Sequence, residues 1–127
     1  MESTFQFKTP ILTKLEYNIN KDYDCLEDME LPMDMSVNVK RDPMQSEAIV
    51  ELSITIGGED DKCPFNISAV EGARFRWNSS LPTEMVDKLL NENAPSLLLS
   101  YLRPVIVQIT SASPFDTFNI PFINFRK

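Results

Sequence analysis

The side chains that could take part in chemistry are mainly carboxylates, and the densest group lies between residues 20 and 34. The acids in this stretch are Asp22, Asp24, Glu27, Asp28, Glu30 and Asp34. Paired carboxylates can act as general acid and base, but acids in a polar run are typical of solvated charge. Their spacing does not fit a calcium loop, which also needs a central glycine. The sequence therefore predicts no metal site here.

Histidine is absent, which removes the commonest general base and the commonest metal ligand. A Ser-His-Asp or Cys-His constellation cannot be built without it. Cys25 and Cys63 lack metal-binding spacing and are expected to be reduced structural thiols. The glycine pair Gly57-Gly58 lies in a strand connection, so no nucleotide loop is present. These features predict a protein that is not an enzyme and has no cofactor; a small carboxylate enzyme is the remote alternative.

The composition narrows the partners. The chain has 127 residues, a net charge of −7 and 43% hydrophobic residues, which predicts a single domain, 1–127, with a real core. An acidic chain repels phosphate backbones and anionic membrane surfaces, so we expect no nucleic acid as partner. The N-terminal residues lack a basic region followed by an apolar run, and no apolar run approaches ~18 residues. We therefore expect a cytoplasmic protein without membrane insertion.

Alternating hydrophobicity predicts four strands joined by short links, which favours an antiparallel sheet with one covered face and one polar face. The strands are expected at residues 5–19 with a break or bulge near Pro10, 35–40, 47–56, and 65–77 with a bulge at Glu71-Gly72. Arg74 and Arg76 fall on the polar side of the last strand and are expected to be surface charges rather than a ligand clamp.

Two helices follow the strands, at about 82–91 and 95–111, with Pro95 fitting a helix start and Pro114 a stop. The second helix is apolar over an arc of about 200°, whereas a helix on one sheet needs only ~100°. Its narrow polar strip is formed by Ser96, Ser100, Arg103 and Thr110. One flank is therefore expected to meet another subunit or an apolar ligand. The alternative is that the Phe-rich tail after Pro114 folds back over it.

The fold class predicted is α+β: a four-stranded antiparallel sheet followed by two helices packed on one face. The loop at 20–34 connects the first two strands and mixes its acids with Tyr23, Leu26, Met29, Leu31 and Met33. Long loops in compact domains are often functional, and methionines suit surfaces that accept varied partners. This loop is either a binding flap or a solvated acidic crossover whose apolar residues anchor it to the core.

Three segments carry a resemblance to a known family: EGARFRW at 71–77, NAPSLLLSYLRP at 93–104, and IPFINF at 120–125. Together with the four strands and two helices, they resemble the SecB protein-export chaperone family. The matching places are Glu71-Gly72, Phe75, Ala94-Pro95, Leu99, Tyr101 to Arg103, Phe115, Phe118, Ile120-Pro121 and Asn124-Phe125. The resemblance covers nearly the whole chain, and its specific part is the C-terminal third.

The resemblance implies an ATP-independent holdase that binds unfolded polypeptides, serves preprotein export, and assembles as a homodimer or homotetramer. The family's client groove is lined by the crossover after the first strand, the long helix and the segment behind it. The residues expected to bind peptide are Met29, Leu31, Met33, Leu99, Ile106, Phe115, Phe118, Ile120 and Phe122.

One departure concerns the export motor SecA, which the family docks through acidic side chains on the outer sheet face. Those places fall near Leu15, Ile19 and Ser68, which are not acidic, unless the alignment slips by one residue to Glu16. The alternative function is therefore a dedicated peptide-binding module of the same fold, such as a chaperone that guards an antitoxin, without SecA docking.

Overall fold

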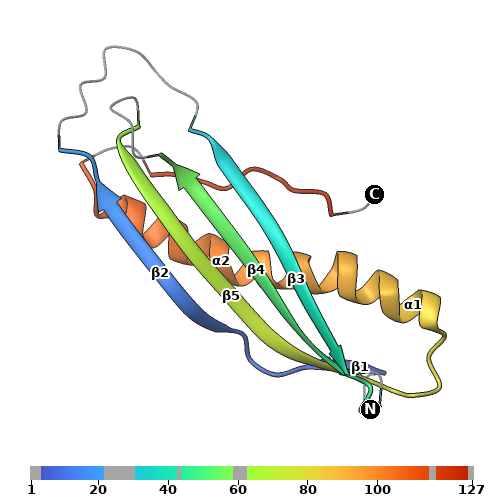
Figure 1. Ribbon diagram of the computed structural model, residues 1–127. Helices are drawn as coiled ribbons and strands as arrows, with labels where there is room; N and C mark the ends of the chain where they lie inside the picture. The colour runs from blue at the N-terminus through green and yellow to red at the C-terminus, as the bar shows by residue number, and fades with distance from the viewer. Residues whose placement is uncertain (1–3, 22–30, 43, 59–62, 115–116, 126–127) are drawn as a thin grey trace.

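The protein is an α+β fold in which a five-stranded antiparallel sheet is followed by a helical rod on one of its faces (Figure 1). The computed structural model describes residues 4–21, 31–42, 44–58, 63–114 and 117–125. The strands are β1 (Phe5–Phe7), β2 (Ile11–Ile19), β3 (Met33–Asp42), β4 (Glu47–Gly57) and β5 (Phe65–Trp77). Five strands replace the predicted four because the first segment divides at Pro10, which cannot donate to a ladder.

Strand β5 is the centre of the sheet, because β1, β2 and β4 all pair with it, and β3 extends the sheet from β4. The β4–β5 register runs without a shift from Glu47 opposite Arg76 to Gly57 opposite Asn66. The predicted bulge at Glu71-Gly72 is therefore not in β5. An irregularity does occur at this point, but the extra residue lies in β2, because Leu12 pairs with Glu71 and Lys14 with Val70. Gly72 allows the Glu51 side chain of β4 to lie close to the β5 backbone, since a Cβ at Gly72 would lie 3.2 Å from the Glu51 Cγ.

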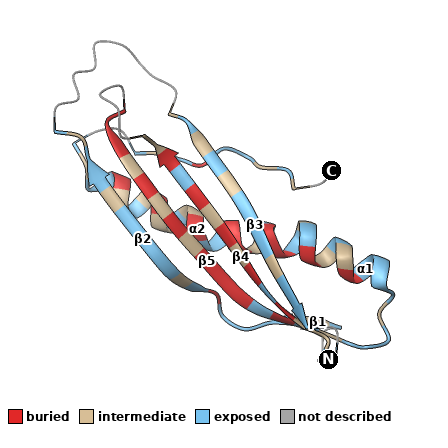
Figure 2. Ribbon diagram, viewed as in Figure 1, coloured by how far each residue is buried: buried red, intermediate tan, exposed pale blue. Residues whose placement is uncertain are grey.

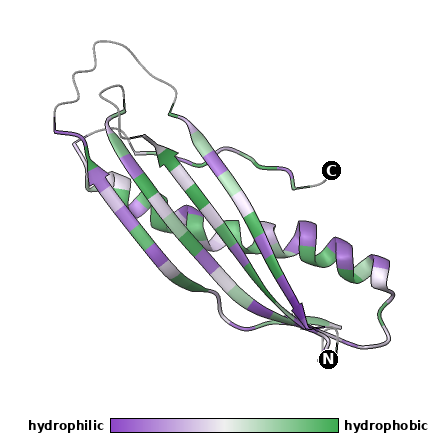
Figure 3. Cartoon of the chain, viewed as in Figure 1, coloured by the Kyte–Doolittle hydropathy of each residue, from purple (hydrophilic) through white to green (hydrophobic). Residues whose placement is uncertain are grey.

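The core lies between the sheet and the rod. Alternate side chains of β4 and β5 are buried, which gives these strands their striped pattern of burial and hydropathy (Figures 2 and 3). The buried members are Ala48, Val50, Leu52, Ile54, Ile56, Phe65, Ile67, Ala69, Ala73 and Phe75. They pack against Val86, Leu90, Leu98, Leu102 and Ile106 of the rod. Every second side chain of the strands and every third or fourth side chain of the helix thus face each other, and together they form one continuous buried apolar layer.

The rod consists of α1 (Thr83–Lys88), the π-helical η1 (Leu89–Asn93) and α2 (Ala94–Ser111) without an interruption. The sequence predicts two separate helices, and this separation is wrong, since Asn93 keeps helical dihedrals (φ −76°, ψ −42°). The predicted end of the second helix at Ser111 is confirmed. Pro95 lacks an N–H, so one backbone carbonyl of the preceding turn loses its usual donor. The wider turn of η1 lies directly before it, and such π segments are uncommon.

Gly57, at the end of β4, has φ +80°, and a Cβ added there would lie 2.0 Å from the Phe65 carbonyl oxygen. We expect Gly57→Ala to lower the free energy of unfolding by about 2 kcal/mol or more, because both the dihedral and the contact are unfavourable to a side chain. Gly58→Ala is the control, since its Cβ would meet only the Cys63 Sγ at 3.7 Å. Urea unfolding of both variants measures the difference, and equal losses would contradict this account.

Candidate functional site

The Phe-rich segment that follows α2 turns back and is fastened to the helix by hydrogen bonds with two of its polar side chains, Arg103 and Thr110. The Arg103 guanidinium donates hydrogen bonds to the carbonyl oxygens of Ile120 and Pro121, the second at 2.9 Å. The Thr110 hydroxyl accepts from the Phe118 N–H at 3.0 Å and donates to the Ile106 carbonyl at 2.7 Å. Thr110 belongs to the narrow polar strip expected on this helix, and the structure shows that it is fully buried.

This segment, residues 117–125, is called the tail strap. Its apolar side chains differ in exposure, because an extended chain sends successive side chains in different directions. Ile120 is buried, Phe118, Ile123 and Phe125 are partly buried against the core, and Phe122 is 87% exposed. The tail strap therefore covers the flank of α2 that carries Arg103 while it presents an aromatic side chain to solvent.

The opposite flank of α2 stays partly open. Tyr101 lies about 160° around the helix from Arg103 and is 39% exposed. Leu15 and Ile19 of β2 are opposite the buried Ala69 and Phe65, so they share the helix-facing side of the sheet, yet they are 40% and 41% exposed. This side of the molecule thus carries apolar side chains that the described part of the chain leaves partly uncovered.

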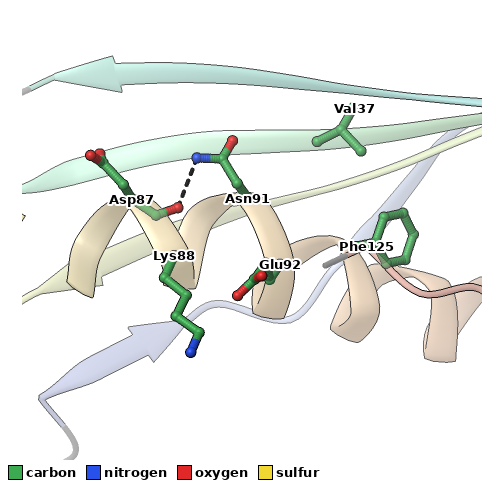
Figure 4. Close-up of a pocket in the computed structure, with 6 residues that line it drawn as sticks. All are labelled: Val37, Asp87, Lys88, Asn91, Glu92 and Phe125. Atoms are coloured by element: carbon green, nitrogen blue, oxygen red, sulfur yellow. Dashed lines mark hydrogen bonds between the residues drawn. The ribbon is translucent and has the colours of Figure 1, made fainter. Parts of the chain in front are cut away.

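A cavity of about 640 Å³ lies where the end of the tail strap meets α1, η1 and β3 (Figure 4). Val37 and Phe125 supply its apolar wall, and Asp87, Lys88, Asn91 and Glu92 supply its polar rim. The Asn91 side-chain amide donates to the Asp87 carbonyl at 2.7 Å, as Figure 4 shows.

Charged contacts fix one side of this cavity. Arg41 of β3 forms an ion pair and hydrogen bond with Asp87 of α1, and its guanidinium lies 5.7 Å from the Trp77 ring centroid. The Asp87 carboxylate and the face of the Trp77 ring both attract the Arg41 guanidinium. This arrangement ties β3 to α1 and to the end of β5, so the cavity has a stable wall on that side.

The structure divides the residues predicted to bind peptide into three groups. Leu99, Ile106 and Ile120 are buried within the core. Leu31, Met33 and Phe118 are partly buried at its margin, and Phe122 is exposed. Met29 and Phe115 lie outside the described residues. The role of these side chains in peptide binding stays a prediction, but only the second and third groups offer surface to a ligand.

Sequence reasoning missed the contribution of α1 and η1 to the cavity. The signal was the polar side of the short helix, where Asp87 and Asn91, and likewise Lys88 and Glu92, lie four residues apart. Such a pattern is the ordinary solvated face of a helix. It becomes a rim here because the tail strap and β3 lie beside it.

Glu71 is an acid on the helix-facing side of β5, opposite Leu12 and Leu52. It is 4% exposed, and one carboxylate oxygen, Oε2, has no hydrogen-bond partner among the described residues. Burial raises the pKa of this carboxyl above its ordinary range, because the charged form loses hydration. The Tyr17 hydroxyl is likewise buried with no partner in the described part of the chain.

Two further features concern the described residues alone. They contain no group of three or more His, Cys, Asp or Glu side chains that could hold a metal ion. None of their helices is both long enough and apolar enough to cross a membrane.

The chain has the architecture of a SecB-like α+β protein: an antiparallel sheet with one covered face, a long helix beneath that face, and an extended segment that returns along the helix. The sequence model of the SecB family, described as preprotein translocase subunit SecB, matches residues 13–127. The chain belongs to the SecB family.

Solved structures agree on the fold. The Mycobacterium tuberculosis SecB-like chaperone Rv1957, solved in complex with a ChAD peptide from the Rv1956 HigA1 antitoxin, superposes with a TM-score of 0.76 at 12% identity, covering 94% of this chain and 91% of that chain. A Streptococcus agalactiae protein of unknown function superposes with a TM-score of 0.56 at 14% identity, covering 93% and 97%. No curated protein sequence matches the chain.

We predict that Arg103→Ala releases the tail strap, because the variant loses both hydrogen bonds to the Ile120 and Pro121 carbonyls. Each bond from a charged donor contributes about 1.5 kcal/mol or more. Limited proteolysis with chymotrypsin should cut the tail strap several-fold faster than in the parent protein. Gln108→Ala, an exposed change on the same helix, is the control. Unchanged cleavage in Arg103→Ala would show that the two bonds do not hold the segment.

Glu71 should make stability depend on pH. Its pKa is raised in the folded state, so the folded protein binds more protons than the unfolded chain and its stability falls as pH rises above about 4.3. We expect Glu71→Gln to flatten this part of the profile and to raise the melting temperature near neutral pH by a few degrees. Thermal melts of both proteins from about pH 4 to pH 8 measure this. Parallel profiles would mean that Glu71 does not contribute.

Proposed function

We propose that this protein is a chaperone that binds unfolded or extended polypeptides on the helix-facing side of its sheet. The observation that carries the proposal is the apolar surface bordering the tail strap: Phe122 is 87% exposed, and Phe125 and Val37 line the cavity of about 640 Å³. Membership of the SecB family supports the same reading. The protein acts as a holdase without nucleotide and without catalysis, in the cytoplasm.

Binding follows from the chemistry of this surface. Burial of one client leucine or phenylalanine side chain contributes about 1.5–3 kcal/mol, so a few such contacts offset the cost of ordering an extended segment. Met33 and Met35 of β3 are partly buried beside this surface, and methionine adapts its shape to varied neighbours. Little sequence preference is expected, since shape adaptation rather than specific hydrogen bonds supplies the affinity.

The assembly we propose is a homodimer or homotetramer. The partly exposed Leu15, Ile19 and Tyr101 form an apolar area on the helix-facing side, and apolar areas of this kind mark contact surfaces. A second subunit there would leave the tail strap on the other flank free for clients.

A second function, a module dedicated to one partner peptide, is favoured by a specific comparison. The similar Mycobacterium tuberculosis structure is a complex with an antitoxin peptide. Docking of SecA is not part of the proposal, because the places near Leu15, Ile19 and Ser68 do not form one acidic surface. Ser68 lies opposite Glu16 on the outer face, whereas Leu15 and Ile19 lie on the helix-facing side.

The test is an aggregation assay in which a chemically unfolded, slow-folding protein is diluted into buffer and light scattering is followed. We expect the parent to suppress scattering and Phe122→Asp to reduce the suppression at least about threefold, because an exposed apolar contact is replaced by a charge. Met44→Asp is the matched control, since Met44 is 89% exposed at the β3–β4 turn, away from the tail strap.

Two outcomes count against the general holdase. If the parent fails to suppress scattering at several-fold molar excess over the client, the dedicated module becomes the better account. If Phe122→Asp and Met44→Asp lose activity equally, clients bind elsewhere on the molecule.

A further inference from the structure

The outer face of the sheet, which points away from the helical rod, carries a cluster of cations at the end formed by β1 and β5. A hollow of about 80 Å³ there is lined by Gln6, Phe7, Lys8, Arg74 and Arg76; we call it the basic hollow. The N–H of Lys8, directly after β1, donates to the Arg74 carbonyl of β5 at 3.0 Å, so these two residues are neighbours. Arg74 and Arg76 are exposed, whereas Ala73 and Phe75, which alternate with them along β5, are buried on the other face.

The charge of the basic hollow is opposite to that of the whole chain. The net charge is −7, yet no acid is among the residues that line the hollow. Arg76 pairs with Glu47 at 2.7 Å. Among the described residues, no ion pair involves Lys8 or Arg74, so neither of these two cations has a carboxylate partner of its own.

Glu47 reports the local field. Its pKa lies below the ordinary range, chiefly because of the hydrogen bond from Arg76, with further attraction from Arg74 and Lys8. One carboxylate therefore faces three cations. Like charges held side by side, here Arg74 and Lys8, lower the stability of a sheet, and a local pattern that lowers stability is typical of a functional surface.

The chemistry of the lining favours carboxylates. A guanidinium presents paired N–H donors that match the two oxygens of a carboxylate, and the Gln6 amide adds neutral donors. Two apolar side chains lie on the neighbouring outer surface: Ile49, opposite Arg74, is 39% exposed, and Ile11, opposite Gly72, is 65% exposed. The acidic Glu51 is also opposite Gly72, on the β4 side. Mixed acidic and apolar side chains occur in a polypeptide. A nucleic-acid backbone is negative along its whole length, so the parts beyond the hollow would be repelled by the acidic remainder of the chain, whereas a short acidic segment can place its carboxylates at the hollow alone.

We propose that the basic hollow binds the carboxylate side chains of an acidic segment of a partner protein. This surface lies on the face of the sheet opposite the tail strap, so the proposal is independent of the client-binding function. A chaperone that holds clients beneath the sheet could thus be recognised by another protein from above it.

The experiment measures fluorescence anisotropy of a short fluorescein-labelled peptide of alternating glutamate and serine, titrated with the full chain. We expect binding that weakens as salt is raised from about 50 to 300 mM and that is lost when glutamine replaces glutamate. Arg74→Glu should weaken the affinity about tenfold, and Lys8→Glu about fivefold, because each reverses a charge at the contact. Lys14→Glu, the same change on β2 of the outer face, should change it less than about twofold.

Several results would overturn the proposal: no binding by the parent, equal binding of the glutamine peptide, or equal loss in Lys14→Glu. Tighter binding of a single-stranded oligonucleotide that is lost in Arg74→Glu would assign the hollow to nucleic acid instead. Lys8 follows β1 outside any strand, so Lys8→Gln gives a measurement that does not depend on strand pairing if Arg74→Glu fails to fold. Suppression of aggregation should be unchanged in Arg74→Glu, Lys8→Glu and Lys8→Gln.

Discussion

Burial of one side of β4 and β5 beneath α2 is the interaction on which the rest of the structure depends. Val50, Leu52, Ile67 and Ala69 meet Leu98 and Leu102 with almost no exposed area. Because every second side chain is used in this way, the other side of the same strands has to face outward. The two surfaces to which we assign function are consequences of this division: the tail strap lies on the covered side, and the basic hollow lies on the outer side.

The long helix has more apolar surface than the sheet alone can cover. The described part of the chain covers this additional surface on one flank of the helix more than on the other. One flank receives the tail strap, fastened by Arg103 and Thr110 through backbone carbonyl and N–H groups. The other flank leaves Tyr101 partly exposed. A segment held at two points is easier to displace than a strand paired along its length. This difference underlies our proposal that the tail strap accepts different polypeptides and that the exposed flank forms the subunit contact.

Buried polar groups mark where this simple layer is interrupted. Glu71 interrupts an otherwise apolar row of β5, and its position is part of the sequence pattern that resembles the SecB family. Thr110 is also a buried polar residue, but its hydroxyl is satisfied, since it both donates and accepts a hydrogen bond. This contrast separates two roles. We expect Glu71 to make the stability of the fold depend on pH, whereas Thr110 and Arg103 hold the tail strap against α2.

The sequence by itself determined the α+β class, the antiparallel pairing, the end of the helix and the family, because hydrophobic period, proline positions and a specific C-terminal pattern are local properties of the chain. It did not determine that the two helices join through η1, that Gly72 marks close approach rather than a bulge, or that Thr110 is buried. Leu99 and Ile106 could not be told from ligand-facing residues, since a helical period shows that a face is apolar but not what covers it. Only the tertiary structure decided which flank the tail strap occupies and brought Lys8 beside Arg74, since both depend on contacts between residues distant in sequence.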